Sequence, residues 1–150
     1  MVNVSDKPTT IRTAAASGFI SMKPETLALV EAGKIGKGDV LGVARTAGIM
    51  GTKRTSELIP MCHNLLIESC SVDFRLHKER GEVEAVCTVV TSGKTGVEME
   101  ALVGVNIALM TIYDMCKAGD RGMTLHSIRL DEKHGGKSGT YISEGRRHEG

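Results

Sequence analysis

The sequence predicts an α+β domain in which strands and helices alternate along 150 residues. Some segments repeat apolar residues at helical spacing, others alternate apolar and polar residues as paired strands do, and glycine-rich turns separate them. The predicted order is strand, helix in two pieces, strand, strand, helix, strand. This β-α-β-β-α-β order is that of ferredoxin-like folds, which pack helices on one face of an antiparallel four-stranded sheet.

The first half of the chain is predicted to form a strand and two helical pieces. Residues 11–22 have the β-branched and turn-forming content of a strand. Pro24 suits the first turn of a short helix, and Gly33 suits its end. Asp39 is a good N-cap for a second helix over residues 40–57. The apolar residues at helical spacing in that helix are Val40, Val43, Ala44, Ala47 and Met50.

A hairpin and a long helix follow. Apolar and polar residues alternate over 70–77 and again over 83–89, so the intervening residues 78–81 are predicted to be a hairpin loop. Glycines at the 93–96 loop end the second strand and open a helix that runs to about Lys117. Thr95 and Glu98 have the spacing of a capping box, which predicts that Thr95 caps this helix.

The end of the chain is predicted to be one more strand and a tail. The strand covers residues 123–130, after a glycine-containing turn at 119–122. Beyond it, glycines and cations indicate a mobile tail or a loop that a ligand orders. Because no internal repeat or second hydrophobic unit is found, residues 1–150 are predicted to be one domain, with 140–150 as a flexible tail.

The composition excludes several classes of protein. Hydrophobic residues are 41% and charged residues 25%, which is typical of a soluble globular chain. A net charge of +1 gives no electrostatic case for binding nucleic acid or an anionic membrane. Aromatic residues are 3%, which argues against a base-stacking surface and for extra burial at a subunit interface. With no signal peptide and no membrane-length apolar run, we expect a cytoplasmic protein.

The cysteines are expected to be reduced thiols, because no C-x-x-C pair is present. They are Cys62, Cys70, Cys87 and Cys116. A zinc or thiol site formed by Cys62, Cys116 and His63 is one alternative, but the spacing is not that of zinc ligands. His63 is better suited to hydrogen-bond a polar ligand.

The long helix carries an unusual polar pair at its end. Asp114 and Lys117 are one helical turn apart, while most of the helix is apolar. As a local ion pair they would contribute only about 0.2–0.5 kcal/mol. Burial in such a helix would instead shift both pKa values towards neutrality and give an acid–base pair. The stripe that contains them is Glu100, Val103, Ile107, Met110, Asp114 and Lys117.

Two short motifs resemble phosphate-binding P-loops but fail the full pattern. Gly-Lys-Thr at 93–95 and Gly-Lys-Ser at 136–138 each lack the glycine required five residues earlier, where Thr88 and Asp131 stand. Several loop cations are either ordinary surface residues or, if the fold gathers them, a polyphosphate site. These are Arg12, Lys37, Lys133 and Lys137.

Three longer segments resemble a known family. They read Leu-Ile-Pro-Met-Cys-His at 58–63, Lys-Thr-Gly-Val-Glu-Met-Glu-Ala at 94–101 and Thr-Ile-Tyr-Asp-Met-Cys-Lys-Ala at 111–118. Shorter matches at 2–5, 37–40 and 135–139 extend the likeness over residues 2–139. Together they resemble the cyclic pyranopterin monophosphate synthase family of molybdenum cofactor biosynthesis.

The resemblance implies a phosphorus–oxygen lyase. Its substrate would be 3′,8-cyclo-7,8-dihydroguanosine 5′-triphosphate, and its products cyclic pyranopterin monophosphate and diphosphate. The resemblance also implies action after the radical SAM GTP 3′,8-cyclase, and a homohexamer, a trimer of dimers, with sites at subunit interfaces. It implies no resident cofactor or metal, and leaves open whether magnesium accompanies the triphosphate.

The same resemblance implies residue roles. Asp114 and Lys117 match the family's catalytic pair. The positions that match substrate contacts are Met61, Cys62, His63, Met99, Glu100, Arg12, Lys37 and Lys133. Asn3 departs from the family's usual Asp, and Met61 from its usual Leu. An alternative function is a non-catalytic oligomeric domain that binds a phosphate ligand, in which Asp114 and Lys117 are an ordinary ion pair.

Overall fold

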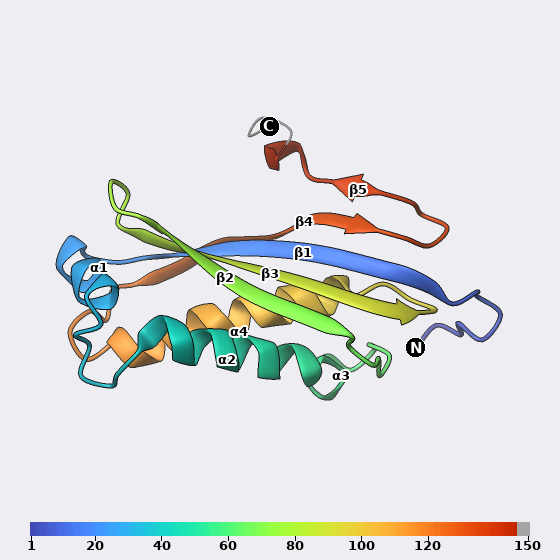
Figure 1. Ribbon diagram of the computed structural model, residues 1–150, viewed down its shortest axis with the longest axis horizontal. Helices are drawn as coiled ribbons and strands as arrows, with labels where there is room; N and C mark the ends of the chain where they lie inside the picture. The colour runs from blue at the N-terminus through green and yellow to red at the C-terminus, as the bar shows by residue number, and fades with distance from the viewer. Residues whose placement is uncertain (147–150) are drawn as a thin grey trace.

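The computed structural model describes residues 1–146 and contains one five-stranded antiparallel sheet with strand order β2-β3-β1-β4-β5. The strands are β1 (Thr10–Ser21), β2 (Ser69–His77), β3 (Glu82–Gly93), β4 (Thr124–His134) and β5 (Tyr141–Ile142). Figure 1 shows the helices on one face of this sheet. The predicted ferredoxin-like α+β fold is confirmed, with β5 as an additional edge strand.

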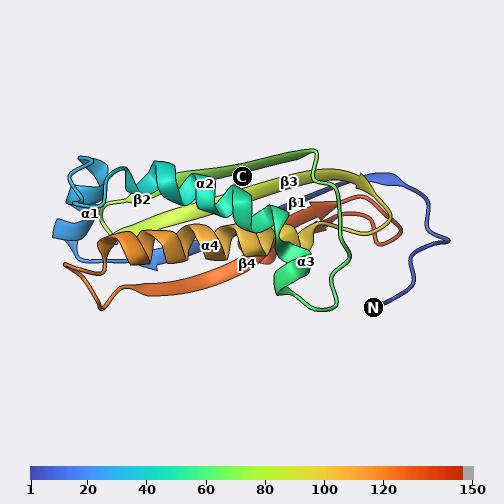
Figure 2. The same cartoon turned by 90° about the horizontal axis from the view of Figure 1, so that it is seen from below.

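Two long helices cover the sheet. α2 (Val40–Lys53) and α4 (Glu98–Cys116) run side by side in opposite directions across it, as Figure 2 shows. α1 (Pro24–Glu31) lies at the end of the molecule where α4 finishes, and α3 (Thr55–Leu58) at the end where α4 begins. A 3-10 turn, η1 (Glu144–Arg146), follows β5.

The predicted hairpin of β2 and β3 is confirmed, and its side chains alternate between buried and more exposed positions. The β3 residues Val83, Ala85, Cys87 and Val89 are fully buried. Polar β2 residues such as Ser71 and Asp73 are exposed on the other face. Period-2 burial of this kind results when one sheet face packs on helices and the other does not.

Small residues allow the helices to pack closely on the sheet and on each other. A Cβ atom placed on Gly48 of α2 would lie 2.9 Å from the carbonyl oxygen of Gly104 in α4. One placed on Gly104 would lie 2.6 Å from both the Cys87 sulfur and the Thr52 hydroxyl. Close backbone contact of this kind suits a core that contains few large aromatic side chains.

α4 is the one helix within residues 1–146 whose length and composition would suffice to cross a membrane. Its packing is that of a core helix, since residues such as Val105, Ala108, Leu109 and Ile112 are fully buried against the rest of the domain.

Some predicted boundaries were wrong. The helix predicted over 40–57 divides at Arg54 into α2 and α3. α4 starts later than predicted, with Val97 at the N-cap and no side-chain cap, so the Thr95 capping box does not form. β4 continues four residues beyond the predicted end at Leu130. Within the predicted tail, β5 pairs with β4, and residues 147–150 lie outside the described residues.

Candidate functional site

Lys37, Asp114 and Lys117 form one group, here called the acid–base cluster, at the last turn of α4. Asp114 Oδ1 accepts a hydrogen bond from Lys117 Nζ at 2.7 Å. Asp114 Oδ2 accepts one from Lys37 Nζ at 2.9 Å, and Lys37 Nζ also donates to the Asp114 carbonyl oxygen at 3.0 Å. The carboxylate is therefore held between two ammonium groups, one of which comes from the loop before α2.

The electrostatics of this cluster differ from the prediction. The hydrogen bonds from Lys117 and Lys37 lower the pKa of Asp114 to about 2, and the Asp114 carboxylate raises the pKa of Lys117. The side chains of Asp114 and Lys117 are 55% and 50% exposed, so the predicted shift towards neutrality by burial is wrong for a single chain. The apolar residues around them, Met115 and Cys116, occupy the inward face of the turn instead.

A local hydrogen bond fixes the end of the loop that carries Lys37. Asp39, the predicted N-cap of α2, accepts a hydrogen bond from the backbone N–H of Gly42 at 3.0 Å, as expected for a capping carboxylate. This bond fixes the loop two residues after Lys37. The fixed N-terminus of α2 therefore helps to place Lys37 beside Asp114.

A second group lies at the opposite end of α4 and is here called the helix-start cluster. Its members line a single cavity of about 280 Å³ between the connection that leads to β2 and the first turn of α4. They are the predicted substrate residues Met61, Cys62, His63, Met99 and Glu100. The structure thus brings together two segments that are nearly forty residues apart in sequence.

Glu100 is the buried member of this cluster. Its side chain is buried, and burial, with a smaller effect of the Glu98 charge, raises the pKa of its carboxyl group. Burial, followed by the charge of Glu100, also raises the pKa of the Cys62 thiol. Burial therefore opposes ionisation of both the carboxyl group and the thiol, which disfavours thiolate chemistry at Cys62.

The alternative zinc or thiol site is wrong for one chain. Cys116 lies at the end of α4, whereas Cys62 and His63 lie beside its beginning. Within residues 1–146, no three His, Cys, Asp or Glu side chains are placed so that they could share a metal ion.

Arg12 and Lys133 lie at the same end as the helix-start cluster. Arg12 is only 8% exposed, and its Nε atom has no hydrogen-bond partner. It lines a cavity of about 420 Å³ together with Lys7, Lys137 and neighbouring small residues. Lys133 Nζ lies 3.6 Å from Glu98 Oε1, and Glu98 lines the cavity of the helix-start cluster. A buried, incompletely bonded guanidinium beside further lysines favours an anionic ligand.

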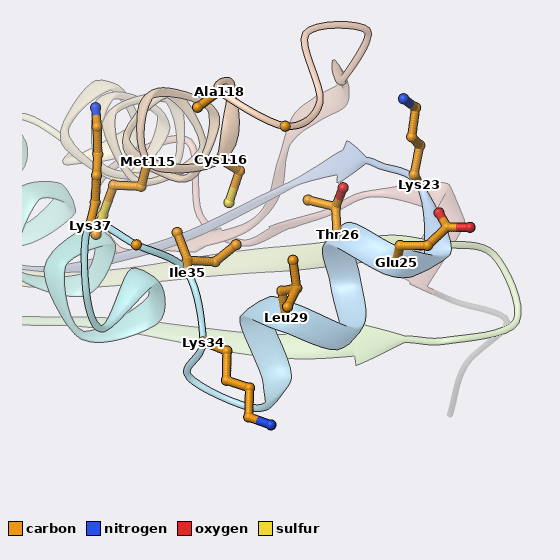
Figure 3. Close-up of a pocket in the computed structure, with 12 residues that line it drawn as sticks. Lys23, Glu25, Thr26, Leu29, Lys34, Ile35, Lys37, Met115, Cys116 and Ala118 are labelled. Atoms are coloured by element: carbon orange, nitrogen blue, oxygen red, sulfur yellow. The ribbon is translucent and has the colours of Figure 1, made fainter.

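The predicted polyphosphate site is therefore divided within one chain. Arg12, Lys133 and Lys137 lie at one end of α4, and Lys37 lies at the other. Beside Lys37 is a further cavity of about 620 Å³, which no sequence signal indicated. Figure 3 shows Leu29, Ile35 and Met115 turned into it.

One contact of the site was missed by reasoning on residue types. His63 Nε2 lies 2.8 Å from the carbonyl oxygen of Val2, so the N-terminal segment reaches the helix-start cluster. Every residue has a backbone carbonyl, so the residue type at position 2 does not indicate this contact. The match of residues 2–5 to the family motif was the available signal.

Comparisons with known proteins find relatives over nearly the whole chain. Residues 1–136 match the model of the MoaC family. A protein of Clostridium acetobutylicum called cyclic pyranopterin monophosphate synthase is 55% identical over 141 residues, which are 94% of this chain and 88% of that protein. The proteins of the same name from Pelotomaculum thermopropionicum and Peptoclostridium acidaminophilum are 53% and 52% identical, over 97% and 96% of this chain and 85% and 90% of theirs.

Proposed function

Because the chain belongs to the MoaC family, we propose that it is a lyase that converts 3′,8-cyclo-7,8-dihydroguanosine 5′-triphosphate into cyclic pyranopterin monophosphate and diphosphate, as a step of molybdenum cofactor biosynthesis. The observation that carries the proposal is the acid–base cluster, in which Asp114 is hydrogen-bonded to Lys117 at 2.7 Å and to Lys37 at 2.9 Å. Asp114 and Lys117 match the family's catalytic pair, and Lys37 matches one of its substrate contacts.

The reaction requires several proton transfers. The five-membered ring of the purine opens, the pyranopterin closes, and a cyclic phosphate forms as diphosphate departs. The Lys117 ammonium is a proton donor that the Asp114 carboxylate orients. To Glu100, whose pKa is raised by burial, we assign a second proton transfer at the other end of the substrate.

Loss of diphosphate requires positive charge at its oxygens. Arg12, Lys37 and Lys133 are the cations that we assign to this task. Arg12 suits it best, because a guanidinium that is already desolvated and has an unused N–H gains more from a phosphate oxygen than an exposed ammonium does.

The two clusters are too far apart to act on one substrate within one chain. Glu100 and Asp114 are separated by about 21 Å along α4, at about 1.5 Å per residue. We therefore place each site between two subunits, with the acid–base cluster of one chain facing the helix-start cluster and Arg12 of another. A homohexamer built as a trimer of dimers is the assembly that we propose.

We place the enzyme in the cytoplasm, directly after the radical SAM GTP 3′,8-cyclase, whose product is the proposed substrate. We assign it no resident cofactor or metal, and a magnesium ion would enter only with the triphosphate. The substrate is a small molecule, and neither nucleic acid nor a membrane takes part.

The direct test is to incubate the purified protein with the cyclised dihydro-GTP intermediate and to measure diphosphate and cyclic pyranopterin monophosphate. Stoichiometric release of both is expected from the wild type and almost none from Asp114→Asn. Absence of any diphosphate from the wild type would leave the non-catalytic phosphate-binding alternative.

A further inference from the structure

The N-terminal segment, residues 2–7, folds back beside the start of α4 (Figure 1). Two turns in succession give it this course. The side chain of Asn3 accepts a hydrogen bond from the backbone N–H of Ser5 at 2.9 Å, and the N–H of Lys7 donates to the carbonyl oxygen of Val4 at 3.1 Å. An Asn side-chain oxygen makes this turn as an Asp would.

This segment has few contacts to hold it. Only Val4 is half-buried, and the rest of residues 2–7 are exposed. Lys94, in the loop between β3 and α4, donates a hydrogen bond from Nζ to the carbonyl oxygen of Ser5 at 2.8 Å. A segment with so little buried area opens readily, so a single charged hydrogen bond has a large share in its order.

The segment forms a wall of the helix-start cluster. Val2, Val4 and Lys7 line a cavity of about 530 Å³. This cavity shares Met61 and His63 with the 280 Å³ cavity in which Glu100 lies. A ligand that fills both of these adjoining cavities would therefore meet both the segment and His63.

The contact between Val2 and His63 determines where the imidazole carries its proton. The partner of Nε2 is a carbonyl oxygen, 2.8 Å away, and a carbonyl oxygen can only accept. Nε2 therefore carries the hydrogen. In the neutral ring Nδ1 is then a free acceptor, whereas the other tautomer would present a donor there.

We propose that Lys94 is a positioning residue of this site: by holding Ser5 it keeps residues 2–7 against the helix-start cluster, so that the Val2 carbonyl fixes His63 as the Nε2–H tautomer with Nδ1 as acceptor for the substrate. The identity of the substrate rests on the proposed function, and the tautomer rests on geometry alone.

The test uses the full chain with ¹⁵N-labelled histidine and the variant Lys94→Met. Nitrogen NMR of the His63 ring, whose signals are identified by their loss in His63→Gln, reports the tautomer without any turnover. The wild type is expected to show Nε2 protonated, and Lys94→Met a mixture of the two tautomers. Lys53→Met, which removes another exposed lysine at the end of α2, is the matched control and should resemble the wild type.

Kinetics provide the second measurement. Lys94→Met is expected to lower kcat by about tenfold or more with a smaller change in KM, because His63 is no longer oriented for the substrate. Lys94→Arg is expected to restore most of the kcat. Circular dichroism should be native for all variants. The same His63 tautomer in Lys94→Met as in the wild type, or a wild-type ring protonated at Nδ1, would overturn the positioning role. If the tautomer shifts as expected while the wild type turns over no substrate, the positioning role stands and the proposed function fails.

Discussion

Glu100 and Asp114 are carboxyl groups on the same helix with opposite electrostatic environments. Glu100 is buried in the first turn of α4, and burial raises the pKa of its carboxyl. Asp114 is exposed in the last turn, and two lysines lower its pKa to about 2. One helix therefore carries a carboxyl group with a raised pKa at one end and a carboxyl group with a lowered pKa at the other.

Removing either member of the catalytic pair should abolish most activity without unfolding the protein. For Lys117→Ala and Asp114→Asn we expect a loss of about 10²–10⁴-fold in kcat, because proton transfer to or from a positioned group has that magnitude. Both side chains are about half exposed, so circular dichroism should stay native. Retention of more than about a tenth of wild-type turnover would contradict the assigned role.

Shared sites predict subunit complementation. Lys117→Ala and His63→Ala each inactivate a different half of a composite site, so chains of both variants are unfolded together, mixed and reassembled. Activity should return, because some interfaces then combine an intact acid–base cluster with an intact helix-start cluster. Mass spectrometry must verify that the chains have exchanged. If verified mixed oligomers are inactive, these two residues do not belong to one shared site.

The acid–base cluster should add stability that is lost in strong acid. The folded pKa of Asp114 is about 2, below its ordinary value of 3.8, so its contribution is complete above about pH 4 and falls as pH drops through 2. The difference in urea midpoint between wild type and Asp114→Asn should therefore shrink from pH 5 to pH 2. It should also shrink in high salt, because exposed charges are screened. A difference that grows on acidification would contradict this pairing.

Gly136 is expected to be required for the orientation of Arg12. Its backbone lies against the guanidinium, and a Cβ atom there would be 1.9 Å from one of the terminal nitrogens of Arg12. Gly136→Ala should therefore displace Arg12 and weaken binding of tripolyphosphate by about tenfold, in keeping with loss of a charged hydrogen bond. Calorimetric titration measures this affinity.

The matched control for that variant is Gly139→Ala. Gly139 also has a positive φ, 67° against 77° for Gly136, but a Cβ atom there would meet nothing within 4 Å. Both variants therefore introduce backbone strain, but only the methyl group added by Gly136→Ala contacts Arg12. Equal losses of affinity would show that strain in the loop, and not the position of Arg12, is responsible.

Local patterns predicted most of the fold because they reflect which face each element buries. The β2–β3 hairpin followed directly from period-2 alternation. The break at Arg54 could not be predicted in this way, since the apolar repeat ends at Met50 and no proline follows it before Pro60. The start of α4 at Glu98 was missed because a capping-box spacing also occurs where the chain is not yet helical.

The site was predicted in its residues but not in its arrangement. The apolar content of α4 suggested that Asp114 is buried, but composition does not show that the last turn presents one face to solvent. Of the apolar residues in the stripe of α4 that contains Asp114, Val103 is buried, Ile107 is half-buried and Met110 is exposed, and a Cβ atom on Gly51 of α2 would touch Ile107. The contact of Lys37 with Asp114 spans 77 positions and depends on how α2 lies beside α4.

The close approach of α2 and α4 at Gly48 and Gly104 has a mechanical consequence. Because backbone touches backbone there, with 2.9 Å from a Cβ on Gly48 to the Gly104 carbonyl oxygen, the antiparallel helices can neither slide nor separate without loss of packing. Lys37 stands just before one helix and Asp114 near the end of the other. Their spacing is therefore set by the packing of the two helices, which brings a lysine from a loop to the same carboxylate as a lysine from the end of α4.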